Sequence, residues 1–198
     1  MTAPLDHPAL RGQPSRRSLL TAGAGAGAAA LLTAGAGSAS AGGWTNPQAH
    51  IFAAAKTRAG APYVSGAAGN WAFDCSGLVM WAVKNATGIT INKTARDQMA
   101  SLRNMRFQQV SRPAVGDLIY YWGWHGGYRY FFHVGFFAGG KSLFHAPYPG
   151  ARVGYGSVDI KQSNGAWATR TYMRCTRATI DYANAVSSRY GGGRPYHC

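Results

Sequence analysis

The sequence predicts an α+β domain in which N-terminal helices pack on an antiparallel β-sheet. Helical patterns come first, between residues 47 and 102. After Pro113, runs of aromatic and β-branched residues alternate with Gly-rich turns, which is typical of strands. Of the 198 residues, 46% are hydrophobic, which is enough to bury one core of ordinary size. Helices followed by strands favour the α+β class over an alternating α/β fold.

Three helices are expected in the first half of the domain. Asn46 and Pro47 open the first, with Asn as N-cap and Pro in the first turn, and Gly60 ends it. The second, over about 76–85, is apolar nearly all round, which indicates a buried helix. The third, roughly 95–102, begins at a capping arrangement of Thr94 and Asp97.

The strands are expected in the second half of the chain. Clear runs cover 118–122, 130–137 and 142–145, and weaker ones lie near 152–155 and 168–174. The segment from Trp122 to Tyr130 is interpreted as a large aromatic loop. The chain end, 178–198, is rich in Gly near its terminus and is expected to be an extension outside the core fold.

The first 41 residues are typical of an export signal. Arg16 and Arg17 form a twin-arginine pattern, followed by the weakly apolar stretch 19–37 and the small-residue cleavage site Ala39-Ser40-Ala41. We expect the mature protein to begin at Gly42, with a single domain over 42–177; a retained membrane anchor is the alternative. Export by the twin-arginine route places the protein in the cell wall or the medium, where disulfides can form.

The charge is strongly positive and excludes several kinds of site. The chain has 20 Lys and Arg against six acidic residues, all Asp, so paired-carboxylate chemistry and an oxygen-rich metal site are disfavoured. Removal of the leader takes away three Arg and Asp6, which leaves 17 − 5 = +12. This charge favours anionic cell-wall polymers as partners. Nucleic acid is disfavoured because the sequence carries no nucleic-acid-binding motif.

Cys75 is the candidate nucleophile among three cysteines. It stands where a Gly-rich loop meets the buried second helix, and the positive end of a helix dipole favours the thiolate form. A small buried hydrophobe or half of a disulfide is the alternative reading. Cys175 and Cys198 lie near each other at the C-terminus, outside the motifs, and we expect them to form a disulfide.

His133 and His145 are the candidate partners of this thiol, because each lies in a strand-like apolar run. They are twelve residues apart, and a three-residue loop over 138–140, with Gly in the left-handed conformation, would place them directly opposite each other on one face of a hairpin. A two-residue loop would place them on opposite faces. The geometry therefore permits a Cys–His–His triad of nucleophile, base and a group that orients the base. His125, in the aromatic segment, is the reserve candidate for the third member.

Five short motifs in order resemble the NlpC-type cell-wall peptidases, which are papain-like cysteine peptidases of bacterial envelopes. The motifs are Pro62-Tyr63-Val64, Asp74-Cys75-Ser76-Gly77-Leu78, Gly116-Asp117-Leu118-Ile119, His133-Val134-Gly135 and His145-Ala146-Pro147. The resemblance covers about residues 47–175. It departs from the family at Ser65-Gly66-Ala67, where Trp-Gly-Gly is frequent, and at Lys93, where Arg is frequent.

The resemblance implies roles for individual residues. Cys75 matches the nucleophile, His133 the base and His145 the third polar position. Tyr63 matches a tyrosine of the catalytic cleft, with a core aromatic as the alternative. Asp74 and Ser76 match residues of the substrate groove, with a helix N-cap as the alternative for Asp74.

The function implied is hydrolysis of peptidoglycan stem peptides at the D-γ-glutamyl–diaminopimelate bond by a monomeric enzyme. No cofactor or metal is expected, because the sequence has no Cys/His cluster with ligand spacing. Two alternatives stay open: an amidase or acyltransferase that uses the same triad, and a wall-binding protein without catalysis.

Overall fold

A computed structural model of the chain describes residues 46–189. The helices are α1 (Pro47–Lys56), α2 (Cys75–Thr87), α3 (Ala95–Asn104) and α4 (Arg177–Arg189). The strands are β1 (Gln108–Val110), β2 (Leu118–His125), β3 (Tyr128–Gly139), β4 (Ser142–His145), β5 (Gly154–Ser157) and β6 (Thr169–Arg174). The export leader, the mature start at Gly42 and Cys198 lie outside the described residues.

The first three helices begin at the residues that the sequence predicts. The side chains of Asn46, Asp74 and Thr94 each accept a backbone N–H from the first turn of their helix. The Thr94 hydroxyl also donates to Asp97 Oδ2 at 2.7 Å, which completes the expected capping arrangement. α2 ends at Gly88, whose φ of 80° is the left-handed conformation of a helix C-cap.

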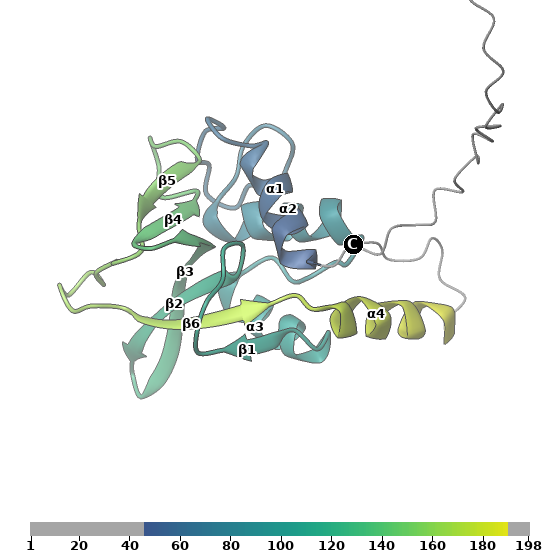
Figure 1. Cartoon of the computed structure of the whole chain (residues 1–198). Coiled ribbons are helices and arrows are strands. Elements are labelled where there is room, and N and C mark those ends of the chain that lie inside the picture. Colours follow the sequence, from purple (N-terminus) through teal and green to yellow (C-terminus); the bar gives the residue numbers. More distant parts are fainter. Residues whose placement is uncertain (1–45, 190–198) are drawn as a thin grey trace, which may run out of the picture. The chain divides into compact units, whose positions relative to one another are not determined.

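The six strands form one antiparallel sheet in the order β1-β6-β2-β3-β4-β5 (Figure 1). The helices α2 and α3 pack against the central strand β3, and α1 packs on α2. This is the predicted α+β arrangement. Asp117 is fully buried, accepts the Ala114 N–H at 2.7 Å and pairs with Arg174 at 2.7 Å, so it fixes the turn that leads into β2.

Two segments differ from the prediction. The expected aromatic loop 122–130 is a hairpin: β2 and β3 continue pairing as far as His125 and Tyr128, and only Gly126 and Gly127 form the turn. Both turn glycines have positive φ, as a tight two-residue hairpin turn requires.

The expected C-terminal extension begins as helix α4 rather than as a segment outside the core. Its Ile180 and Ala183 are buried and belong to the main hydrophobic cluster with residues of α2 and β3. The spacing i, i+3 places both side chains on one face of the helix. Within residues 46–189, no helix has the length and apolar character needed to cross a bilayer.

Candidate functional site

The start of α2 is held by a network of backbone and side-chain hydrogen bonds around Asp74. Its Oδ1 accepts the Gly77 N–H at 2.6 Å and the Ser76 hydroxyl at 3.0 Å, and its Oδ2 accepts the Gly66 N–H at 2.8 Å. A Cβ at Gly77 would collide with the carbonyl oxygen of Ala67. Glycine at this position therefore lets the preceding loop lie directly against the helix that carries Cys75.

Cys75 is the first residue of α2 and is largely buried. Burial, followed by the nearby Asp74 carboxylate, raises the pKa of the Cys75 thiol to about 11. Hydrogen bonds from the backbone N–H groups of Val134, Ser76 and Cys75 itself act in the opposite direction but are outweighed. The expectation that the helix start makes the resting thiol a thiolate is wrong. Burial destabilises the thiolate by more than the positive end of the helix dipole stabilises it.

His133 and His145 lie in contact. Nε2 of His133 is 2.7 Å from Nδ1 of His145, and the two rings are nearly perpendicular, with centroids 4.9 Å apart. This contact occupies Nε2 of His133 and leaves its Nδ1 for another partner. The hydrogen bond from the N–H of Val134, the residue after His133, to the Cys75 sulfur brings the thiol to this same segment of β3.

The strand register that brings the two histidines together is not the one expected. Phe136 pairs with Phe144 and Phe137 with Leu143, so His145 is aligned with Gly135 and not with His133. The turn is Gly140-Lys141, and a bulge at Ala138 adds the residue that keeps both histidines on one face. The predicted shared face is correct, whereas direct opposition and a three-residue turn are wrong.

Two glycines make room for this diagonal contact. A Cβ at Gly135 would lie 2.9 Å from Cβ of His145 and 2.8 Å from Leu143, so glycine permits β4 to approach β3 closely. A Cβ at Gly156 of β5 would lie 2.6 Å from Nε2 of His145. The imidazole of His145 is therefore confined between the His133 ring and the backbone of β5.

Both imidazoles are held in the neutral form. Burial, with a smaller contribution from the neighbouring His145, lowers the pKa of His133 to about 3. Burial also lowers the pKa of His145 to about 4. A neutral imidazole has a lone pair that can accept a proton, as a general base requires.

His133 and His145 line a cavity of ≈ 590 Å³, which residues of β5 also line. Its wall is formed by the two histidines together with Tyr148, which follows β4, Tyr155 of β5 and Asp159, which follows β5. This volume is within the range of small-molecule and peptide pockets. The cavity gives a substrate access to both rings.

Tyr63 is half-buried and lies close to the thiol. Burial, and then the charges of Cys75 and Asp74, raise the pKa of Tyr63, so its phenol stays protonated and can donate a hydrogen bond. By contrast, Asp74 and Ser76 are engaged at the helix start by the hydrogen bonds given above. Their direct contact with substrate stays a prediction.

A buried polar network behind the thiol was not predicted. Gln98 of α3, which is fully buried, donates to the Ser76 carbonyl at 2.8 Å and accepts from the Tyr120 hydroxyl at 2.8 Å. It ties the first turn of α2 to α3 and β2. The sequence did contain a signal for this network, because Gln98 stands at a core-facing position of the helical pattern formed by Ala95, Met99 and Leu102.

Cys175 is buried in the main core, and its predicted partner Cys198 lies outside the described residues.

A family model and several curated proteins match this chain. The model of the NlpC/P60 family matches residues 60–176. Protein P54 of Enterococcus faecium is 36% identical over 110 residues, which are 56% of this chain and 20% of that protein. A γ-D-glutamyl-L-lysine dipeptidyl-peptidase of Bacillus subtilis is 30% identical over 94 residues, which are 48% of this chain and 30% of that enzyme. The chain spans less than half the length of each of these relatives.

Solved structures show the same fold. A Staphylococcus aureus protein described as similar to a lipoprotein of the NLP/P60 family superposes with a TM-score of 0.50 at 28% identity, over 66% of this chain and 42% of that one. NlpC2 from Trichomonas vaginalis gives a TM-score of 0.52 at 25% identity, over 67% and 48% of the two chains.

Proposed function

Since the chain belongs to the NlpC/P60 family, we propose that it is an exported cysteine endopeptidase that hydrolyses the stem peptides of peptidoglycan. The observation that carries this proposal is the contact between His133 and His145, both of which line a cavity. The hydrogen bond from the Val134 N–H to Cys75 brings the thiol to the segment of β3 that carries His133. The peptidase relative named above supports the bond: we propose cleavage between D-glutamate and the diamino acid that follows it, which is diaminopimelate or lysine.

The chemistry begins from a neutral thiol and a neutral imidazole. Nδ1 of His133 accepts the proton of Cys75 as the sulfur attacks the γ-carbonyl carbon, so charge separation develops with the new C–S bond rather than before it. Nε2–H of His133 donates to Nδ1 of His145 throughout, which fixes the ring and stabilises the imidazolium. The neutral His145 is required because only it offers a lone pair there.

The remaining steps follow the acyl-transfer scheme. The carbonyl oxygen becomes an oxyanion, and backbone N–H groups at the start of α2, with the Tyr63 hydroxyl, stabilise it. His133 returns its proton to the amine of the diamino acid, which leaves. Water then attacks the thioester with His133 as base, releasing the glutamyl carboxylate and the thiol.

Mass spectrometry of muropeptides tests this proposal. Incubation of peptidoglycan with the mature protein is expected to give products with a new amino group on the diamino acid. Cys75→Ala is expected to give none, whereas Cys175→Ala, which replaces the other cysteine of the described chain, is expected to remain active. A new amine on L-alanine instead would identify an amidase, and the absence of any product would favour a wall-binding protein without catalysis.

A further inference from the structure

A second cavity, of ≈ 700 Å³, lies beside the one that contains the histidines. It is bounded on one side by the β2–β3 hairpin and on the other by the loop 161–164. Phe132, the residue before His133, forms part of the wall of both cavities. Asp159 and Ile160 of the histidine cavity also lead directly into Lys161 of this one. The two cavities therefore share a wall at Phe132.

One wall of this second cavity is a row of aromatic rings. The Tyr130 and Phe132 rings are nearly parallel, at 22°, with centroids 6.4 Å apart. The His125 ring lies 6.4 Å from that of Tyr130. Tyr130 is 59% exposed although it is a large aromatic residue. Such a row presents electron-rich ring faces on which an apolar C–H surface can stack.

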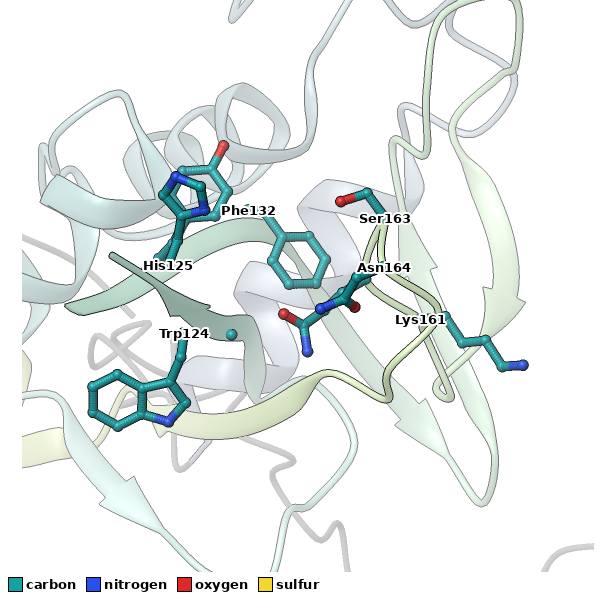
Figure 2. Close-up of a pocket in the computed structure, with 9 residues that line it drawn as sticks. Trp124, His125, Phe132, Lys161, Ser163 and Asn164 are labelled. Carbon is teal, nitrogen blue, oxygen red and sulfur yellow. The ribbon is translucent and has the colours of Figure 1, made fainter. Parts of the chain in front are cut away.

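The opposite wall, formed by the loop 161–164, is polar. Figure 2 shows Ser163 and Asn164 on the far side of Phe132 from His125. Asn164 uses its carbonyl oxygen to accept the Ala166 N–H at 3.0 Å. Within residues 46–189, neither its NH₂ group nor the Ser163 hydroxyl makes a hydrogen bond to another residue. Both are therefore available to a ligand.

The charge of the cavity favours a neutral ligand. No carboxylate lines it, so it does not attract a cation. Its one cationic side chain is Lys161, which lies over the Trp167 ring at 4.9 Å and points away from Phe132 (Figure 2). Lys161 is therefore not placed to bind an anion in the cavity. The Gln162 side chain lies across Gly123, where a Cβ would collide with its amide oxygen, and this contact holds the loop against the hairpin.

We propose that this cavity is a subsite for an N-acetylated sugar of the glycan strand to which the stem peptide is attached. A pyranose ring has apolar C–H faces, which match the aromatic row, and hydroxyl and acetamido groups at its edge, which match Ser163 and Asn164. The inference rests on the function proposed above. The sugar is joined to the L-alanine that precedes D-glutamate, so a sugar in this cavity would place the acyl side of the substrate toward Phe132.

Binding and cleavage test this inference separately. In Cys75→Ala protein, the peptide-free disaccharide of N-acetylglucosamine and N-acetylmuramic acid is titrated and followed by NMR shifts. We expect shifts at Tyr130, Ser163 and Asn164, and a loss of affinity of roughly tenfold in Tyr130→Ala. Tyr128→Ala is the matched control, because Tyr128 is on the same strand, is 66% exposed and does not line the cavity.

In active protein, the disaccharide-linked stem peptide is expected to have a higher kcat/KM than the free stem peptide. Tyr130→Ala should remove that advantage and leave cleavage of the free peptide unchanged. An absence of disaccharide shifts, shifts caused instead by a free stem peptide, or an equal effect of Tyr130→Ala on both substrates would overturn the sugar subsite. Failure of the wild-type protein to cleave either substrate would reject the proposed function, while the disaccharide titration would still decide what the cavity binds.

Discussion

In the proposed mechanism, the neutral state of His145 allows it to orient His133. Burial lowers the pKa of both imidazoles, to about 4 and about 3. Each protonated form is inactive: a protonated His133 cannot accept the thiol proton, and a protonated His145 cannot accept the hydrogen bond from His133. We therefore expect activity to be retained below the ordinary histidine pKa of 6.5 and to be lost as the pH falls through about 4.

We predict that substitutions at His145 distinguish its role in orienting His133 from the effect of its own protonation. His145→Asn supplies a carbonyl acceptor that does not titrate, so it should keep part of the activity, within about tenfold to a hundredfold of wild type. His145→Ala should be weaker. In strong acid, the logarithm of kcat/KM should fall with a slope of two for wild type and one for His145→Asn, because only His133 then titrates.

Unfolding in acid must be measured alongside this pH profile. The unfolded chain takes up protons on these histidines near 6.5 and the folded protein only near 4 and 3, so stability decreases as the pH falls through that interval. Circular dichroism measures the folded fraction at each pH, and only rates measured on folded protein enter the pH profile. If His145→Ala is as active as wild type, His145 is not the third member of the triad. His125 or a backbone carbonyl would then be the candidate for that role.

The edge strand β5 contributes to the site through its backbone. Gly154 and Gly156 are both on β5, but they differ in how much space is available for a Cβ atom. A Cβ at Gly156 would lie 2.6 Å from Nε2 of His145, whereas the nearest atom to a Cβ at Gly154 is 3.9 Å away. A displacement of His145 also displaces His133, since the rings are in hydrogen-bond contact.

Gly156→Ala is therefore expected to reduce kcat by roughly a hundredfold, as a misplacement of about 1 Å in a catalytic group does. Gly154→Ala is the control and should stay near wild type. Both variants should melt within a few degrees of wild type, because β5 is an edge strand and both positions are outside the buried core. Equal activities of the two variants would show that β5 does not confine His145.

The positive charge belongs to the molecule as a whole rather than to the site. Removal of the predicted leader would leave 17 basic residues against five acidic ones. Exposed charges act over a Debye length, about 10 Å at 0.1 M salt and about 3 Å at 1 M. Attraction to phosphate-bearing wall polymers should thus be a salt-sensitive, sequence-independent contribution to binding.

We expect the mature Cys75→Ala protein, which leaves the wall intact, to bind purified cell walls less as salt is raised from 0.05 to about 1 M. Walls stripped of their phosphate polymers should bind it less at low salt and show little salt dependence. Co-sedimentation measures both. Binding that does not change with salt would mean that the charge has no part in wall attachment.

Local signals in the sequence were sufficient for the helices and for most strands. Caps at Asn46, Asp74 and Thr94 are determined by neighbours three residues away, and alternating aromatic runs reveal strands without knowledge of their partners. Helix α4 and the tip of the β2–β3 hairpin, beyond Trp122 and before Tyr130, were missed because their apolar residues are mixed with Gly, Arg and polar residues. Only packing on the core, as at Ile180, shows which of them are buried.

The sequence alone determined the α+β class and the cysteine at a helix start, since these follow from the order of the elements and from local caps. It also predicted that the two histidines share a face, but from a turn that the structure does not have. Folding in three dimensions determined the rest. The bulge at Ala138 set the diagonal contact of the histidines, and burial reversed the expected charge state of Cys75. Gln98, Gly156 and the cavity beside Phe132 join segments far apart in sequence, and no local pattern encodes which segments meet.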